Sequence, residues 1–169
     1  MIYIGAHLSA SRGFLSMGKQ ALEIGADTFA FFTRNPRGGK ARKLDRSDAD
    51  ALMELMEEHH FGKIVAHAPY TMNLCSDKPD IRKFAEDMLT EDMERMEATP
   101  GQYYNFHPGS HVGQGADEAI PMIAEALNKA MFEDMTTTVL LETMAGKGTE
   151  VGKNFEEIQR IIESVKLQD

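Results

Sequence analysis

The sequence predicts an α/β fold made of five successive strand–helix units. Short apolar segments alternate along the chain with longer amphipathic ones, a pattern typical of parallel strands joined by crossover helices. Each apolar segment also runs into a polar side chain at its carboxyl end. The expected strands are 2–7, 28–33, 64–67, 103–107 and 139–142, and the expected helices are roughly 14–24, 48–60, 80–98, 118–131 and 155–165.

Residues at the ends of these elements support the assignment. Pro79 suits the first turn of the third helix, where the amide hydrogen that proline lacks would have no partner. Asn154 followed by Glu157 is typical of a capping box at the start of the fifth helix. Gly25 and Gly101 lie between a helix and the next strand, where a residue that ends the helix is required.

Composition favours one domain over residues 1–169 and excludes several classes of protein. The chain is 42% hydrophobic, which allows a sizeable core. It has no apolar run near the length of a membrane span and no charged-then-apolar leader, so we expect a cytoplasmic protein with no membrane partner. The single cysteine, Cys75, excludes an internal disulfide framework and a cysteine-rich zinc finger. A metal site must therefore use histidine and carboxylate ligands.

The charge of the chain is unevenly distributed. The net charge is −9, which argues against nucleic-acid binding over the whole surface. Residues 34–46 are the exception, because they carry six cationic side chains and one acidic one. This basic segment is interpreted either as a solvated loop that leads into a helix or as a loop that contacts phosphate.

Three of the polar side chains that follow strands are metal-binding types, namely His67, His107 and Glu142. Matching ends of parallel strands meet at one rim, so these residues can converge although they are far apart in sequence. An isolated histidine at a strand end is more often a hydrogen-bonded structural residue. Glu142 ends the apolar run 139–141, and burying its carboxylate would cost several kcal/mol unless a cation compensates it.

Two architectures fit these patterns. One is a complete five-stranded doubly wound sheet, and the other is the opening portion of an eight-stranded (β/α) barrel. Length alone favours the first, since a barrel typically needs about 250 residues.

The loops that follow the third, fourth and fifth strands favour the barrel. Their motifs are His67-Ala-Pro-Tyr-Thr-Met-Asn, Asn105-Phe-His-Pro-Gly-Ser-His-Val-Gly and Leu141-Glu-Thr-Met-Ala-Gly-Lys-Gly-Thr-Glu. Together, and in this order, they resemble endonuclease IV from Ile4-Gly-Ala-His-Leu-Ser to Phe155-Glu-Glu-Ile. The resemblance implies a TIM-type (β/α) barrel, here truncated to about five βα units, and a zinc enzyme of base excision repair. Such an enzyme hydrolyses the DNA phosphodiester on the 5′ side of an abasic site in double-stranded DNA.

The resemblance also implies roles for individual residues. His67 and His107 match ligands of one zinc ion, and Glu142 matches a catalytic carboxylate that bridges this ion to a second. Arg37 and Tyr70 match residues that enter the DNA, where an aromatic ring can replace a missing base and a guanidinium can grip phosphate. His7 and His111 are candidates for orienting a metal ligand or contacting phosphate.

The resemblance stops before the strands that supply the family's other zinc ligands. The complete family site holds three zinc ions, and this chain fully supplies at most one, with His67, His107 and Glu142 as a His₂Glu set. We therefore expect an incomplete (β/α)₈ barrel that is inactive or feeble alone and self-associates through exposed strand edges. The alternatives are a metal-dependent sugar isomerase or epimerase on a similar barrel, and a non-catalytic metal-binding fragment.

Overall fold

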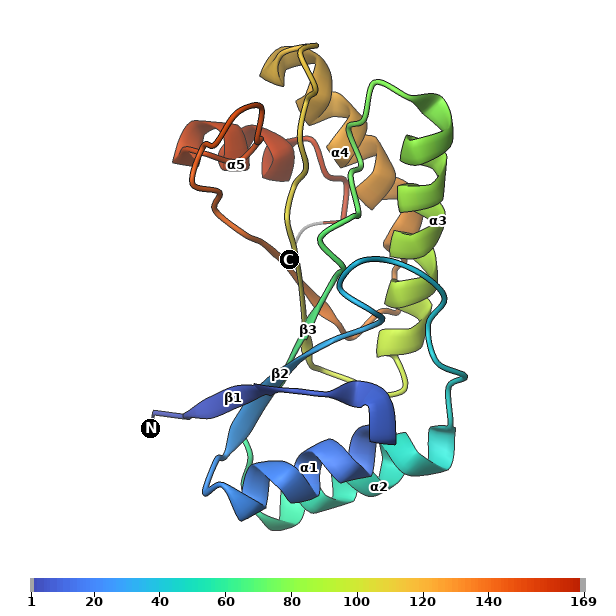
Figure 1. Cartoon of the computed structure of the whole chain (residues 1–169), viewed down its shortest axis with the longest axis vertical. Coiled ribbons are helices and arrows are strands. Elements are labelled where there is room, and N and C mark those ends of the chain that lie inside the picture. Colours follow the sequence, from blue (N-terminus) through green and yellow to red (C-terminus); the bar gives the residue numbers. More distant parts are fainter. Residues whose placement is uncertain (1, 168–169) are drawn as a thin grey trace.

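The computed structural model describes residues 2–167 and contains the five strand–helix units that the sequence predicts. A short 3-10 helix, η1 (Ala10–Arg12), follows the first strand. The strands are β1 (Gly5–Leu8), β2 (Thr28–Phe32), β3 (Val65–His67), β4 (Tyr103–Phe106) and β5 (Thr138–Leu141). The helices are α1 (Phe14–Glu23), α2 (Arg46–Glu58), α3 (Pro79–Met96), α4 (Ala116–Ala130) and α5 (Phe155–Glu163), as Figure 1 shows.

The order of the strands decides between the two expected architectures. All neighbouring pairs are parallel, and the order across the sheet is β1-β2-β3-β4-β5, so each strand pairs with the one before it. A doubly wound sheet would reverse direction at a switch point. In a (β/α) barrel, by contrast, each strand pairs with the one before it and the order continues in one direction. The structure therefore confirms the barrel-type fold, of which the chain supplies five units.

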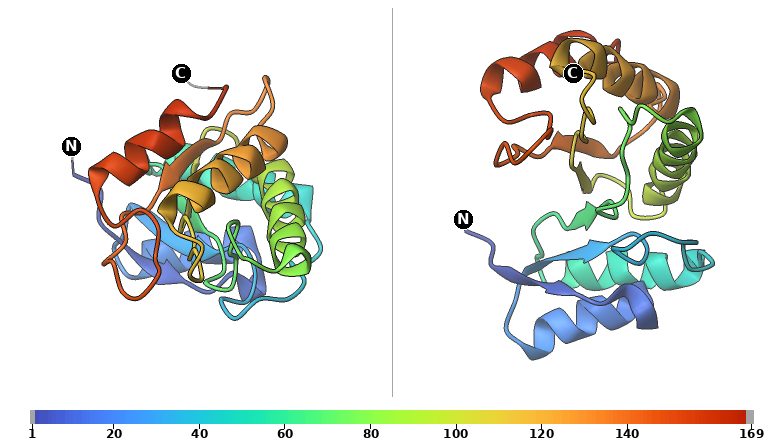
Figure 2. Two further views of the ribbon diagram at one scale, coloured as in Figure 1. Left: turned by 90° about the horizontal axis from the view of Figure 1, so that it is seen from above. Right: turned by 45° about the horizontal axis from the view of Figure 1, so that its top comes forward.

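The helices form an arc on one face of the sheet, as expected for the outer layer of a barrel. In Figures 1 and 2, α1 and α2 lie beside β1 and β2, whereas α4 and α5 lie at the β5 end. The described helices also contact one another in chain order, with α1 against α2, α3 against α4, and α4 against α5. The opposite face of the sheet carries the polar side chains considered below.

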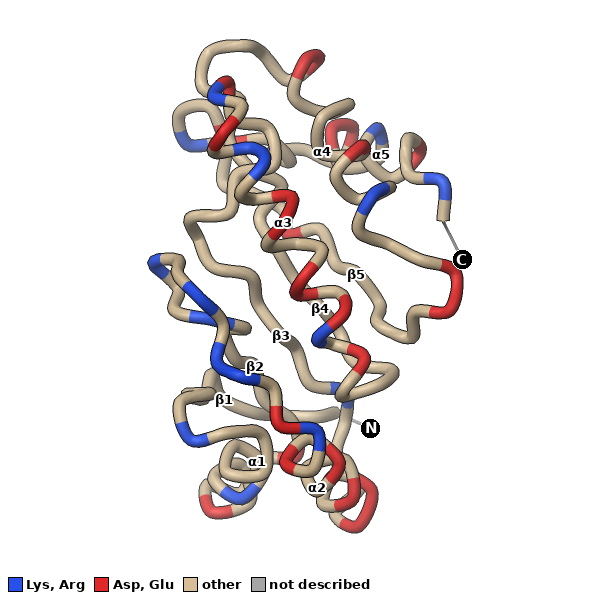
Figure 3. Tube along the Cα trace, turned by 90° about the vertical axis from the view of Figure 1, so that its right-hand side faces the viewer, with Lys and Arg blue, Asp and Glu red and all other residues tan. Residues whose placement is uncertain are grey.

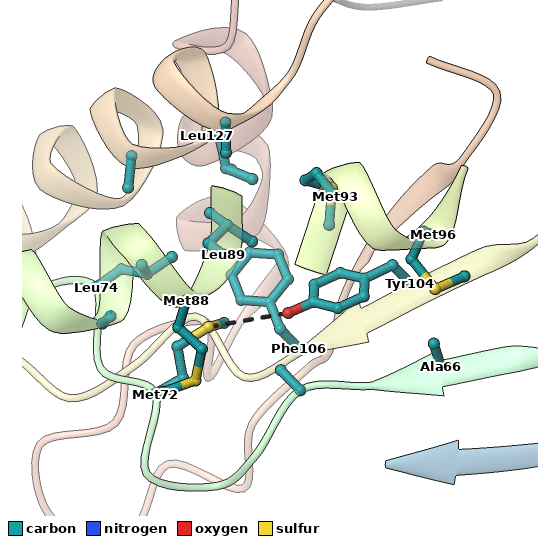
Figure 4. Close-up of a cluster of buried hydrophobic side chains, with 14 of the residues drawn as sticks. Ala66, Met72, Leu74, Met88, Leu89, Met93, Met96, Tyr104, Phe106 and Leu127 are labelled. Carbon is teal, nitrogen blue, oxygen red and sulfur yellow. Dashed lines mark hydrogen bonds between the residues drawn. The ribbon is translucent and has the colours of Figure 1, made fainter. Parts of the chain in front are cut away.

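The hydrophobic core fills the space between the sheet and these helices. Every second side chain of a strand points toward the helices. In β2 and β4 these are Phe29, Phe31, Tyr104 and Phe106, which are all nearly inaccessible to solvent. Methionine and leucine side chains of α3 pack against Tyr104 and Phe106, as Figure 4 shows. The adaptable thioether chains fill irregular space between aromatic rings.

The first strand is shorter than expected. We predicted residues 2–7, but β1 begins at Gly5, which is the first residue paired with β2, opposite Thr28. Before that pair, the Ile4 amide donates to the side chain of Asp27 at 2.6 Å instead of to a strand neighbour. Because the pairing with β2 begins only at Gly5, residues 2–4 lie outside the sheet. Ile2 and Ile4 are consequently exposed.

The helix ends mostly follow the expected signals. Pro79 occupies the first turn of α3, and the Asn154 side chain caps α5 by accepting from the Glu157 amide at 2.8 Å. The second helix begins two residues earlier than predicted, because Asp45 caps it by accepting from the amides of residues 47 and 48. Within residues 2–167, no helix combines the length and apolar character needed to cross a membrane.

Candidate metal centre

Three strands bring the predicted metal ligands to one rim of the sheet. His67 ends β3, His107 directly follows β4 and Glu142 directly follows β5. In the register of the sheet, Phe106 lies opposite Leu141, so His107 and Glu142 leave their strands at the same level. Side chains two residues apart on a strand share a face, and the ligands lie on the face that the helices leave uncovered.

The three side chains converge within the reach of a single ion. Nε2 of His67 lies 3.0 Å from Oε2 of Glu142, and Nε2 of His107 lies 3.6 Å from the same oxygen. One ligand atom from each residue lies within 4.8 Å of both others. Ligands about 2.0–2.1 Å from a tetrahedral zinc ion are separated by about 3.3 Å, so these spacings suit a shared cation.

The hydrogen bonding of His67 indicates which nitrogen could bind metal. Its Nδ1 lies 2.6 Å from the carbonyl oxygen of Ala68. A carbonyl only accepts, so Nδ1 must be the protonated donor. In the neutral ring, Nε2 then presents a lone pair to the Glu142 carboxylate, an arrangement that needs a proton or a cation between the two atoms. Histidine ligands are usually oriented in this way by a backbone carbonyl on their second nitrogen.

Asn105 completes the arrangement and was missed in the sequence analysis as a site residue. It lies opposite His67 in the strand register, and its amide donates to Oε2 of Glu142 at 2.5 Å. The bond fixes the carboxylate that both histidines face. The available signal was the polar residue inside the otherwise aromatic strand Tyr103–Phe106.

The pKa shifts of His107 and Glu142 both favour the forms that bind metal. Burial lowers the pKa of His107, and the neighbouring His67 acts in the same direction, although the Glu142 charge opposes them. Burial would raise the pKa of Glu142, but hydrogen bonds from Asn105 and His67 and the charge of His107 hold it below its usual value. A neutral imidazole and an ionised carboxylate are the forms that bind a cation.

Tyr70 and His7 lie beside the cluster. The Tyr70 side chain is exposed, with 60% of its surface accessible, and its ring centre lies 5.3 Å from that of His107 and 5.7 Å from that of His67. His7 reaches the cluster through Phe32, whose ring lies 4.5 Å from His7 and 5.2 Å from His67. Burial followed by the charge of His67 lowers the pKa of His7.

His111 is engaged with its own loop. Its Nδ1 accepts from the backbone amides of Gly113 and Gly115, each at 3.2 Å. Its backbone amide donates to the carbonyl of Thr149 at 2.9 Å, which joins the loops that follow β4 and β5. His111 thus helps to order the loops at the rim, and its predicted role in orienting a metal ligand or contacting phosphate stays a prediction.

The basic segment borders a separate cavity of about 640 Å³. The cavity is lined by His7 and residues 8–11 on one side and by residues 32–36, Lys40 and Arg42 on the other. Arg37 is exposed in this segment, and the segment touches the Tyr70 loop where the Tyr70 amide donates to the carbonyl of Pro36 at 3.0 Å. Figure 3 shows the cationic positions gathered beside β2, opposite the acidic positions of α3.

Arg34 departs from the expectation of a solvated basic loop. Its side chain is buried and forms ion pairs with Asp92 and Glu91 of α3. The charges of those two carboxylates raise the pKa of Arg34 against the effect of burial. The remaining cationic residues of the segment, Arg37, Lys40, Arg42, Lys43 and Arg46, are exposed.

Comparisons with known proteins agree with the fold and with the resemblance. Residues 19–169 match the model of a family described as xylose isomerase-like TIM barrel. A protein of Alkaliphilus oremlandii named probable endonuclease 4 is 54% identical over 169 residues, which are all of this chain and 60% of that protein. The chain therefore spans about 60% of the length of this curated relative.

Solved structures give the same result. Endonuclease IV from Thermus thermophilus matches 99% of this chain with a TM-score of 0.84 and 27% identity, over 61% of its own length. A D-tagatose 3-epimerase-like protein matches 98% of this chain and 62% of its own at a TM-score of 0.67, but with 18% identity, which shows a shared fold alone. The resemblance to endonuclease IV inferred from the loop motifs is thus confirmed.

Proposed function

The chain belongs to the xylose isomerase-like TIM barrel family, and from this premise we propose that it is part of a zinc-dependent DNA-repair endonuclease. The proposed reaction is hydrolysis of the phosphodiester 5′ to an abasic site in double-stranded DNA. Similarity to proteins named endonuclease 4, together with the rim of the sheet, supports the proposal. A DNA substrate fits the expected cytoplasmic location, which stays a prediction.

One observation carries the proposal more than any other. Two imidazole nitrogens, from His67 and His107, face the same carboxylate oxygen of Glu142. Nitrogen and oxygen donors both suit zinc, and three protein ligands leave a fourth position open. Bound zinc would supply Lewis-acid polarisation of phosphate and a water of lowered pKa. His67, His107 and Glu142 would hold the ion, with Asn105 and the Ala68 carbonyl orienting Glu142 and His67.

The rim beside this cluster suits a DNA backbone with a missing base. Tyr70 presents an exposed ring next to the two histidines, and Arg37 lies in the adjoining basic segment. An abasic nucleotide has already lost pairing and stacking, so an inserted aromatic ring displaces it at low cost. A sugar isomerase or epimerase, the alternative enzyme class, has no evident use for a cationic segment and an exposed tyrosine at this rim.

We propose that the chain by itself cleaves feebly or not at all. It provides one His₂Glu set, and phosphoryl displacement commonly uses two cations about 3.5–4 Å apart to stabilise the attacking and leaving oxygens. If the chain does not cleave at all, it is a non-catalytic metal-binding fragment. Metal and DNA binding are therefore better tests of the chain than its turnover.

The open edges of the sheet support a second element of the proposal, which is self-association. The edge strands β1 and β5 have the sequences GAHL and TVLL, with neither charge nor proline. Charged residues and proline are common in edge strands because they prevent strands of different molecules from pairing. Sedimentation velocity over a tenfold range of concentration checks this expectation. A chain that stays monomeric throughout would contradict it.

The test of function combines zinc titration with DNA binding. The wild-type chain should bind one zinc equivalent, and His107→Ala should lose it, whereas His59→Ala should not. His59 is a matched control because it is an exposed histidine at the end of α2, away from the rim. The zinc-loaded chain should also prefer a duplex with one abasic analogue over the intact duplex. Zinc binding that His107→Ala leaves unchanged, or equal affinity for both duplexes, would overturn the proposal.

A further inference from the structure

Helix α3 holds the first residue of the basic segment, Arg34, through two carboxylates. The Arg34 side chain is 3% exposed, and its Nη2 donates to Oδ1 of Asp92, whose side chain is fully buried. Its Nη1 donates to Oε2 of Glu91 at 3.2 Å and reaches the carbonyl of Gly39 at 3.5 Å. One guanidinium therefore connects α3 to both arms of the turn that contains Arg37.

Asp92 is itself fixed from three directions. Besides the Arg34 guanidinium, its Oδ2 accepts from the hydroxyl of Thr33 at 2.7 Å and from the hydroxyl of Tyr104 at 3.0 Å. These donors come from the end of β2 and from β4. A buried charge with such partners has one defined arrangement, since removing any partner leaves a polar group without compensation.

The contacts of Arg34 with Glu91 and Asp92 form a first tie between α3 and the basic segment. A second tie lies one helical turn further along α3. Nη2 of Arg95 donates to the carbonyl of Arg42 at 2.6 Å, and Nη1 of Arg42 donates to the carbonyl of Ser11 at 3.1 Å. Residues 91 and 95 of a helix are neighbours on one face. The helix thus holds the segment at both ends, and the segment in turn holds the loop after β1 on the other side of the cavity.

We propose that Asp92 and Arg95 are positioning residues that hold the basic segment in the conformation that binds DNA. The inference rests on the proposed function. Between the two ties lie Arg37 and Lys40, and the tie at Pro36 joins the segment to the Tyr70 loop. A cationic loop held in place before binding loses less conformational entropy when it meets phosphate. Neither Asp92 nor Arg95 needs to touch the DNA.

The test compares how ordered the basic segment is, in three variants, with how tightly the same variants bind zinc and DNA. Asp92→Asn keeps the shape of the side chain but removes its charge, so it should loosen residues 35–43. Arg95→Met removes the second tie without burying a polar group and keeps the test valid if Asp92→Asn folds poorly. Asp87→Asn is the matched control, because Asp87 lies on the same helix in an exposed ion pair with Lys83.

The first measurement is the rate of trypsin cleavage after Arg37 and Lys40 in the chain without DNA. We expect about a tenfold increase for Asp92→Asn, about threefold for Arg95→Met and no change for Asp87→Asn. Zinc affinity should stay the same in all three variants, while affinity for the abasic-analogue duplex should fall about tenfold for Asp92→Asn. A merely structural role would instead raise cleavage throughout the chain and lower zinc affinity together with DNA affinity.

Two results would overturn the inference. One is unchanged cleavage at Arg37 and Lys40 in both variants, and the other is faster cleavage with unchanged duplex affinity. A different result would overturn the proposed function instead, namely a wild-type chain that binds neither duplex while the two variants still show faster local cleavage. In that case the ties from α3 would stand as the device that orders the segment, without a DNA ligand.

Discussion

A glutamate carboxylate lies at each end of β5, Glu97 from the C-terminal end of α3 and Glu142 directly after the strand, and the two are held in opposite ways. At the amino end, Glu97 accepts from the amides and hydroxyls of Thr136 and Thr137, at 2.6–3.1 Å. At the carboxyl end, Oε2 of Glu142 is shared by Asn105, His67 and His107. The first carboxylate is satisfied by neutral donors of two adjacent threonines, whereas the second faces two imidazole rings.

The difference separates a carboxylate that stabilises the fold from one that we propose binds metal, at the two ends of one strand. Four hydrogen bonds leave Glu97 no need for a further partner, so its role is to fix the chain where β5 begins. Glu142 remains 40% exposed at its side chain, and its neighbours are metal-ligand types. Parallel α/β folds place chemistry at the carboxyl ends of strands, and the contrast between the two glutamates is a local instance of that rule.

The largest expected effect is the loss of zinc affinity in Glu142→Gln. The carboxamide cannot supply a negative oxygen to the ion, so the dissociation constant should rise more than about 100-fold, beyond the range typical of residues that only orient a ligand. The free energy of unfolding without metal should fall by less than in Glu97→Ala, because the carboxamide keeps an oxygen that can accept from Asn105. Competition with a chromophoric chelator and urea unfolding measure the two quantities. Unchanged zinc affinity would remove the distinction between the two ends of β5.

Glu97→Ala should produce the reverse pattern. Removing the carboxylate leaves two amides and two hydroxyls of Thr136 and Thr137 without their acceptor, and we expect a loss of about 2 kcal/mol in the free energy of unfolding. Zinc affinity should stay unchanged because the cluster lies at the other end of the strand. Urea unfolding at pH 7 checks the first quantity, and the same zinc titration checks the second. A large change in zinc affinity would show that the two ends are coupled.

Asn105→Ala should reduce zinc affinity by less than Glu142→Gln. The variant keeps all three ligands but removes the donor that orients the Glu142 carboxylate, and losses of about 10–100-fold are typical of such orienting residues. Asn105→Asp is a sharper control, because it places a second negative charge beside Glu142 and restores no donor. If Asn105→Ala binds zinc as tightly as the wild-type chain, then the strand register alone positions Glu142.

The comparison also shows what the sequence could predict and what it could not. His67, His107 and Glu142 were predictable because parallel register converts a position at a strand end into a position in space. The partners of Arg34 were not, since Asp92 lies 58 residues away on a helix and an arginine in a basic loop is ordinarily solvated. Asn105 was overlooked because one amide within a strand has no periodic signature, and β1 begins later than predicted because apolar residues alone do not fix where pairing with β2 starts.

The smallest expected effect is the pH dependence that Glu97 contributes. Burial would raise its pKa, but hydrogen bonds from Thr137 and Thr136 outweigh burial and hold the pKa below its ordinary value. A carboxylate with a depressed pKa stabilises the folded state above its unfolded pKa, about 4.3, and this contribution disappears as pH falls through the folded value. The free energy of unfolding of the wild-type chain minus that of Glu97→Gln should therefore be constant from about pH 7 to 5 and shrink at lower pH. Urea unfolding at each pH measures the difference, and a difference that stays constant down to about pH 3 would mean that the four hydrogen bonds do not depend on the charge.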